Sequence, residues 1–194
     1  MHVVVINHVT LDGVMQGPGR PDEDTRGGFA HGGWANARHD EAMQPWIGQR
    51  MGQPGSALLL GRRTYDDVLR SWNEQPDNPF AEPLNAMAKH VASRDPSTPL
   101  PWPNSELLVG DVPTAVAELK AGPGGNLVTM GSGALIHSLL PHGLVDELML
   151  MIHPLVLGCG LRLFPDGGTT TALELTDSQT TATGVVLATY RVDR

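Results

Sequence analysis

The sequence lacks several features that mark common classes of protein. It has one cysteine, Cys159, which excludes an intramolecular disulfide and a cluster of thiolate metal ligands. No run of apolar residues is long enough to span a bilayer, so we expect no membrane partner. The first residues also lack the basic start and apolar core of a signal peptide. We therefore expect a cytoplasmic protein.

Positive charge is scarce as well, and the formal net charge of −8 argues against a general nucleic-acid binder. It still allows a local basic pocket for an anionic cofactor. Glycine and proline are abundant, with 23 and 16 residues, which indicates many turns between short elements. A length of 194 residues without a linker-like tract predicts a single domain over residues 1–194.

The apolar patterns predict an α/β protein. Strands alternate with helices in the first three quarters of the chain, and two strands close it, which favours a mostly parallel sheet with an antiparallel edge. The β-branched run Val3–Val9 is predicted to be a central strand, interrupted by Asn7 and His8. The other predicted strands are Ser56–Leu60, Lys89–Ser93, Leu107–Val109, the run from Leu127 to Met130, Asp146–Val156, Leu173–Leu175 and Val185–Val192.

Helices are predicted from Arg62 onward, over Pro113–Lys120 and from Leu135 onward, with a single turn at Leu84–Met87. Trp34–Met51 fits a helix imperfectly, because Pro45 should start, end or kink it. Residues 73–83 read as a surface loop. The Gly-rich segment Thr10–Gly33 is a longer loop, and loops of that length inside a domain are often functional.

Three strand ends carry groups suited to an anion. Gly131-Ser132-Gly133 lies between a strand and a helix, where free N–H groups stabilise phosphate; a plain turn with Ser132 as N-cap is the alternative. Gly61-Arg62-Arg63-Thr64 repeats this pattern with two guanidinium groups, which bind phosphate bidentately. Ser93-Arg94 follows a third strand. The carboxyl ends of strands in open α/β sheets are where nucleotides bind.

These motifs, in this order, resemble the cofactor side of dihydrofolate reductase-like folds. The resemblance is closer to the reductase domain of riboflavin biosynthesis and its stand-alone relatives, and it covers nearly the whole chain. Further matching motifs are Thr10-Leu11-Asp12-Gly13, Leu144–Leu148, His153–Gly158, Gly160, Leu163 and Phe164. The resemblance implies a three-layer fold with helices on both faces of the sheet, and an NADPH-dependent reductase.

The resemblance also implies roles for single residues. Arg62, Arg94 and Ser93 would hold the 2′-phosphate of the adenosine ribose, which distinguishes NADPH from NADH. Arg63 and Thr64 would lie by the pyrophosphate, as would the start of the second helix. The cofactor-binding residues implied in this way are Gly61, Arg62, Arg63, Thr64, Ser93, Arg94, Gly131, Ser132, Gly133, Ala134 and Leu135.

The substrate side carries fewer signals. Asp12 either orients substrate and relays a proton, as a catalytic residue, or closes an Asp-Gly turn. Trp34 is a candidate to line a flat aromatic pocket. Asp40 lies where dihydrofolate reductases use a carboxylate, although a solvated helix face also explains it. His153 is a pocket candidate or a histidine at the core edge. No histidine shows metal-ligand spacing, so no metal site is expected.

Three functions follow from these observations. The first is an NADPH-dependent reductase of a heterocyclic small molecule with a pteridine, pyrimidine or flavin-like ring. The second is the 5-amino-6-(5-phosphoribosylamino)uracil reductase of riboflavin biosynthesis. That enzyme usually has a basic residue directly after the Asp-Gly pair, where this chain has Val14. The third is a non-catalytic module that binds NADPH or another nucleotide. A homodimer is expected through the apolar strands near Leu148–Leu157 and the closing strand pair.

Overall fold

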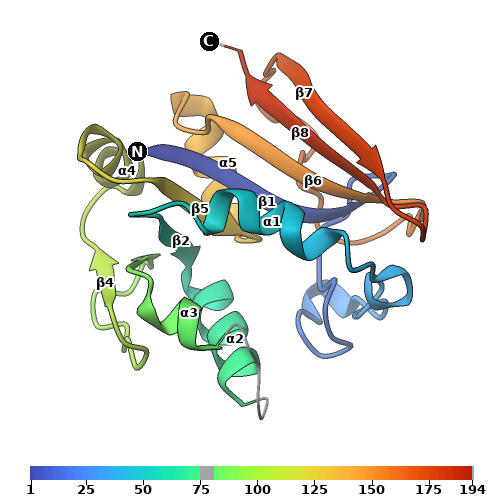
Figure 1. The fold of residues 1–194 in the computed structure, drawn as a ribbon. Coiled ribbons are helices and arrows are strands. Elements are labelled where there is room, and N and C mark those ends of the chain that lie inside the picture. Colours follow the sequence, from blue (N-terminus) through green and yellow to red (C-terminus); the bar gives the residue numbers. More distant parts are fainter. Residues whose placement is uncertain (75–80, 194) are drawn as a thin grey trace.

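The computed structural model describes residues 1–74 and 81–193. Within them, eight strands form one sheet in the order β4-β3-β2-β5-β1-β6-β8-β7 (Figure 1). The strands are β1 (His2–Thr10), β2 (Ala57–Gly61), β3 (Lys89–Ala92), β4 (Ser105–Leu108), β5 (Asn126–Met130), β6 (Glu147–His153), β7 (Leu173–Thr180) and β8 (Val186–Val192). The helices are α1 (Met43–Met51), α2 (Arg62–Asn73), α3 (Ala81–Ala86), α4 (Val112–Ala121) and α5 (Gly133–Leu139), with short 3-10 turns at Arg26–Gly28, Asn36–Arg38 and Leu140–His142.

Strand β1 occupies the middle of the sheet, as its β-branched sequence predicts. It pairs in parallel with β5 on one side and β6 on the other. The strands from β4 to β6 are all parallel, and β8 and β7 then continue the sheet antiparallel. The predicted mostly parallel sheet with antiparallel C-terminal strands is therefore confirmed.

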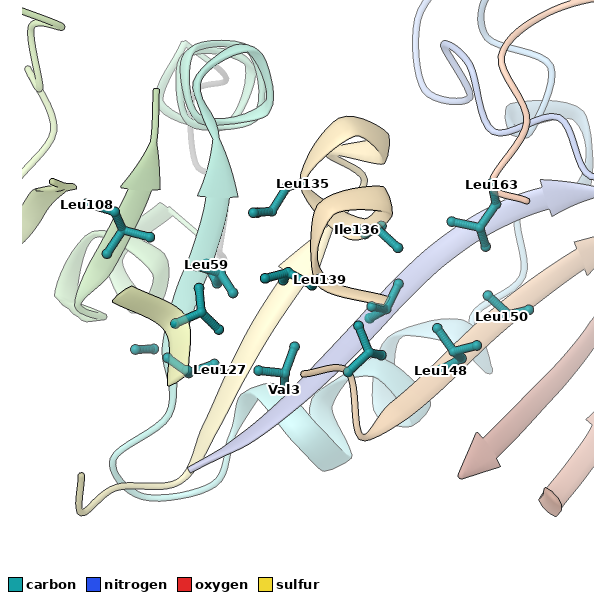
Figure 2. Close-up of a cluster of buried hydrophobic side chains, with 14 of the residues drawn as sticks. Val3, Leu59, Leu108, Leu127, Leu135, Ile136, Leu139, Leu148, Leu150 and Leu163 are labelled. Atoms are coloured by element: carbon teal, nitrogen blue, oxygen red, sulfur yellow. The ribbon is translucent and has the colours of Figure 1, made fainter. Parts of the chain in front are cut away.

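Helices cover both faces of the sheet, which makes the fold three-layered. On one face, α4 and α5 pack over alternate residues of β1 such as Val3 and Val5 (Figure 2). Leu135, Ile136 and Leu139 give α5 its apolar side, because helical spacing places them on one stripe. On the other face, α1, α2 and α3 pack over the intervening residues of β1, Val4 and Ile6.

Several predicted boundaries differ from the structure. Only Met43–Met51 of the proposed segment Trp34–Met51 is α-helical, and Pro45 lies in its first turn, where an N–H has no intrahelical acceptor. Strand β6 ends at His153, before Pro154, rather than at Val156. Strand β7 runs on to Thr180. Most of the loop predicted over residues 73–83 lies outside the described residues.

Polar groups at the amino ends of the parallel strands bond to one another. The Asp146 carboxylate accepts a hydrogen bond from the N–H of Val3 at 2.8 Å and forms an ion pair with Lys120. Arg50 pairs with Glu147 at 2.6 Å. The fully buried Lys89 donates to three carbonyl oxygens, those of Asn85, Met87 and Pro103, at 3.1, 2.8 and 2.9 Å. The charged side chains at this end of the sheet are thus paired within the chain.

Candidate active site

A cleft of about 1870 Å³ lies at the opposite end, where the parallel strands terminate. Pockets for a single small ligand span roughly 300–1,000 Å³, so this volume suits a dinucleotide together with a second molecule. Every residue predicted to bind the cofactor lines this cleft. They are Gly61, Arg62, Arg63, Thr64, Ser93, Arg94, Gly131, Ser132, Gly133, Ala134 and Leu135. The ends of β2, β3 and β5 therefore meet at one site.

Ser132 joins two of these strand ends. Its hydroxyl accepts a hydrogen bond from the N–H of Gly61 and donates one to the Thr64 hydroxyl, both at 2.8 Å. A Cβ at Gly61 would lie 3.1 Å from the Ser132 Oγ, so a side chain there would crowd the hydroxyl. Ser132 has a φ of +61°, a left-handed conformation that costs a residue with a side chain about 1–3 kcal/mol. Such strain is typical of ligand sites.

A third strand is tied to the same turn. The N–H of Gly131 donates to the Asn7 side-chain oxygen at 2.9 Å, so β1 and β5 are fixed together beside the cleft. Gly131 adopts a φ of +67°, which glycine accommodates without strain. This bond explains why the buried, β-branched strand β1 contains Asn7, which is only 6% exposed.

Two of the helices that begin at this edge have no side-chain cap. Gly61, before α2, has no side chain, and the Ser132 hydroxyl, before α5, accepts no hydrogen bond from the first turn of its helix. The third helix, α4, is capped by the Asp111 carboxylate, which accepts from the N–H of Thr114. Ser132 was considered as an N-cap from the sequence, and its hydroxyl bonds across to β2 and α2 instead. Uncapped N–H groups at the start of a helix stabilise anions.

The arginines at this edge differ in their partners. Arg62 Nε donates to Asp66 at 2.5 Å, one turn further along α2. Arg94 is exposed and forms no ion pair within residues 1–74 and 81–193. Beside it, the Ser93 hydroxyl accepts hydrogen bonds from the N–H of Asp95 and the hydroxyl of Thr98. Unneutralised positive charge therefore borders the cleft despite the acidic composition.

The segment predicted as a long loop, Thr10–Gly33, forms one wall of the cleft. The buried Gln16 holds it together, donating to the carbonyls of Asp24 and Arg26 and accepting from the N–H of Leu161 at 2.9 Å. Arg20 pairs with Asp67 of α2, which connects the loop to the cofactor side. Burial raises the pKa of Glu23, which accepts from the N–H groups of Gly19 and Arg20.

Asp12 lies outside the lining of the cleft. Its carboxylate accepts hydrogen bonds from the Thr10 hydroxyl at 2.6 Å and from the N–H groups of Leu157 and Gly158 at 3.2 and 2.8 Å. These bonds, that from Thr10 first, lower the pKa of Asp12 to about 2. The carboxylate therefore fastens the end of β1 to the 155–158 segment and is poorly suited to donate a proton near neutral pH.

The other predicted substrate residues also lie behind the cleft rather than in its lining. Asp40 accepts from the N–H groups of Ala42 and Thr183 at 3.0 and 3.3 Å, so it holds two surface turns together. Trp34 donates from Nε1 to the Gln16 carbonyl at 2.8 Å. His153 is 1% exposed and packs edge-to-face against Trp34. All three side chains therefore contact neighbouring segments of the chain and do not line the cleft.

Sequence reasoning missed residues that do line the cleft. Asn7, His8, Met15 and Gln16 all contribute, as does the turn from Val109 to Pro113 after β4. The signal available for two of them was polarity: Asn7 and His8 interrupt an otherwise apolar central strand. His8 bonds through Nδ1 to Nε2 of His153 at 2.9 Å, which links His153 to the cleft indirectly.

Among the described residues, no group of three or more His, Cys, Asp or Glu side chains is arranged to hold a metal ion. In the same part of the chain, no helix has both the length and the apolar character required to cross a membrane.

The match that decides the family covers residues 1–187 and is to the RibD C-terminal domain. The chain belongs to the RibD C-terminal domain family. The uncharacterized protein YyaP of Bacillus subtilis strain 168 is 30% identical to this chain over 192 residues. The match covers 94% of this chain and 90% of YyaP. The family relationship predicted from the ordered motifs is thus confirmed.

Solved structures show the same fold for this RibD C-terminal domain protein. A protein assigned to riboflavin biosynthesis from Shewanella sp. PV-4 is similar with a TM-score of 0.74 and 22% identity, covering 100% of both chains. A pyrimidine reductase-like protein of Corynebacterium diphtheriae gives 0.65 and 15%, covering 100% of this chain and 92% of that one. Dihydrofolate reductase of Enterococcus faecalis, complexed with NADP(H) and RAB-propyl, gives a TM-score of 0.58 and 14% identity, covering 100% of this chain and 97% of that one. The dihydrofolate reductase-like fold is therefore confirmed, and family and fold together point to a reductase of a heterocycle.

Proposed function

We propose that this protein is an NADPH-dependent reductase that transfers a hydride to a heterocyclic small molecule. The observation that supports it most is the meeting of three separate chain turns at one cleft, with Arg62, Arg94 and Ser132 all in its lining. Each turn follows a parallel strand, and the cleft has room for a dinucleotide and a second ring.

The residues present fit the cofactor. Arg62, Arg94 and Ser93 would hold the 2′-phosphate, because guanidinium groups bind phosphate bidentately. The uncapped starts of α2 and α5 would receive the pyrophosphate. When bound, the nicotinamide supplies the hydride. The chain itself contributes an apolar floor, formed by Ile6, Met43, Ile47, Met130 and Met151, that excludes water and orients the acceptor ring.

The first experiment tests cofactor recognition. The double variant Arg62→Ala/Arg94→Ala should lose the preference for NADPH over NADH by at least tenfold, on the order of 1–3 kcal/mol, because the 2′-phosphate loses its cations. Titration of each nucleotide by isothermal calorimetry measures this preference. Arg70→Ala is the matched control, since Arg70 is exposed on α2 and outside the cleft lining. An unchanged preference in the double variant would refute the assigned phosphate pocket.

The second experiment separates a reductase from a non-catalytic nucleotide-binding module. The protein is incubated with NADPH and a panel of pteridines, pyrimidinediones and flavins, and NADPH oxidation is followed by absorbance. We expect turnover with at least one ring class. Tight NADPH binding without oxidation on any member would favour the module.

The riboflavin-pathway reductase is a second candidate, and Arg162 favours it. Val14, where that enzyme usually has a basic residue, is fully buried here and cannot reach a substrate. Arg162, however, pairs with Val14 through an antiparallel bridge, is exposed and lines the cleft. It could thus supply the charge that a ribosyl phosphate requires. Reduction of 5-amino-6-(5-phosphoribosylamino)uracil that is lost in Arg162→Ala would establish this function.

We also propose a homodimer that uses strand β7. Strand β6 is not available as an edge, because β1 and β8 flank it, so pairing there cannot occur as the sequence suggested. Strands β7 and β4 are the two edges of the sheet, and on β7 the side chains of Leu173 and Leu175 are 36% and 53% exposed. Exposed apolar edges favour association. Light scattering during gel filtration should give twice the chain mass, and Leu175→Lys should reduce it.

A further inference from the structure

Two histidines, His8 and His153, form a hydrogen-bonded pair at the part of the cleft proposed for the substrate. His8 lies on β1 and lines the cleft, whereas His153, at the end of β6, is 1% exposed and does not. His8 Nδ1 and His153 Nε2 are 2.9 Å apart, a hydrogen-bond distance. The indole of Trp34 stands edge-to-face against His153, with ring centroids 5.1 Å apart, and fixes the plane of its ring.

The direction of this hydrogen bond follows from the remaining nitrogen of His153. Its Nδ1 is buried and has no partner among the described residues. A neutral imidazole carries one N–H, and a buried N–H without an acceptor is rarer and less favourable than a buried lone pair. The proton of His153 therefore lies on Nε2, which donates to His8 Nδ1. His8 must then carry its own proton on Nε2.

Both rings are neutral near physiological pH. Burial lowers the pKa of His8 to about 3, with further contributions from the charges of His153 and His39. Burial lowers the pKa of His153 to about 4, and Arg38 adds to the effect. A neutral His8 has a single N–H, and His153 already occupies its Nδ1. The ring therefore has its donor on the opposite side, and Nε2 makes no hydrogen bond within the described chain.

We propose that His8 is a substrate-binding residue whose Nε2–H donates a hydrogen bond to an acceptor on the ring being reduced, and that His153 is the positioning residue that fixes this tautomer. The inference rests on the proposed reductase function. The neighbouring cleft residues Ile6, Met43 and Met151 are apolar, so one donor among them orients a flat ring. The substrate class is a heterocycle with a carbonyl oxygen or unprotonated ring nitrogen on its buried edge.

The tautomers can be measured without any substrate. Long-range nitrogen–proton correlation spectra of protein labelled in its histidine rings distinguish Nδ1–H from Nε2–H, and spectra of His8→Gln and His153→Phe assign the two signals. We expect both rings as the neutral Nε2–H form. A His8 ring protonated on Nδ1 would overturn the proposal, because the hydrogen bond would then run the other way and leave the cleft an acceptor.

Kinetics with the best substrate of the panel tests the use of this donor. His8→Phe should raise the KM for the heterocycle at least tenfold, and His8→Gln, which keeps an N–H, should recover part of that loss. His153→Phe should have a smaller effect of the same kind. The Kd for NADPH should stay unchanged in all three. His90→Phe, a matched change on β3 outside the cleft lining, should behave like the unmodified protein.

The outcomes separate this inference from the proposed function. An unchanged KM in His8→Phe, or an equal loss with His8→Gln, would overturn the role of the donor while leaving the reductase intact. If no ring in the panel is reduced, the reductase proposal fails, and the ring tautomers still decide whether His8 offers a donor to the cleft.

Discussion

The two ends of the parallel strands differ in how their polar groups are used. At the amino ends, Lys120 pairs with Asp146, Arg50 pairs with Glu147, and Lys89 donates to three carbonyls. At the carboxyl ends, α2 and α5 begin without side-chain caps and Arg94 forms no ion pair in the described chain. The polar groups at the amino ends are bonded within the chain, whereas groups at the carboxyl ends can still bond to a ligand.

This difference separates stability from function. A substitution at the amino ends breaks a buried pair, so the free energy of unfolding should fall. A substitution at the carboxyl ends should mainly reduce ligand affinity, because much of the hydrogen-bonding capacity there faces the cleft. Substitutions at the two ends should therefore separate an effect on stability from an effect on ligand affinity, with the largest effect at Lys120.

Lys120→Met should lower the free energy of unfolding by about 3–5 kcal/mol, because it breaks the buried ion pair between Lys120 and the Asp146 carboxylate. Chemical denaturation measures the loss, and NADPH affinity of the folded protein should be unchanged. The double variant Lys120→Met/Asp146→Leu should recover part of the stability, since no buried charge remains. A reduced NADPH affinity in folded Lys120→Met would break the separation between the two ends.

Ser132→Ala should reduce NADPH affinity about tenfold while lowering the free energy of unfolding by only about 1 kcal/mol. The substitution removes the acceptor for the Gly61 N–H and the contact with Thr64, so the two helix starts are no longer held together. Calorimetric titration and denaturation measure the two quantities. Ser97→Ala, at an exposed serine outside the cleft lining, should alter neither.

Asp12→Asn should destabilise the protein by about 1 kcal/mol near neutral pH, because the ionised carboxylate accepts three hydrogen bonds. The folded pKa of about 2 lies below the unfolded value of about 3.9. The contribution is therefore complete above about pH 4 and is lost as the pH falls toward 2. Unfolding measured across this range should show the two proteins converging. Loss of turnover with unchanged stability would instead restore Asp12 as a catalytic residue.

Asp66→Ala should have the smallest effect on stability, at most about 0.5 kcal/mol, because its pair with Arg62 is a partly exposed contact within one helix. Releasing the guanidinium should strengthen NADPH binding by a few fold, whereas NADH binding should not change. Competitive titration of the two nucleotides checks this. Weaker NADPH binding would mean that Asp66 orients Arg62 for the phosphate rather than competing with it.

The residues proposed for the cofactor could be placed together from the sequence because their motifs are local. Gly61-Arg62-Arg63-Thr64 and Gly131-Ser132-Gly133 each combine a turn, a helix start and a polar side chain within a few residues. The fold placed every one of these residues in the cleft lining. The substrate side was harder, because its groups come from positions remote in the chain, such as His8 and Met151, which share no motif.

The fold class followed from local patterns too, with errors where tertiary contacts set the boundaries. The sequence of Trp34–Met51 fits a helix imperfectly, and in the structure Trp34 and Asp40 are held in turns by Gln16 and by the N–H of Thr183. Those partners lie 18 residues away or more, beyond the reach of helical periodicity. Strand β6 stops at His153, which Trp34 and His8 surround.

The sequence by itself determined the order of strands and helices, the central position of β1 and the positions of the three polar turns after β2, β3 and β5, because hydrophobic periodicity and glycine placement act over a few residues. Only the tertiary structure decided which polar side chains serve the cleft. The Asp12 side chain holds the 155–158 segment, and the His8 side chain lines the cleft. Hydrogen bonds to segments more than 140 residues away fix both groups. Chemical type alone does not encode such partners.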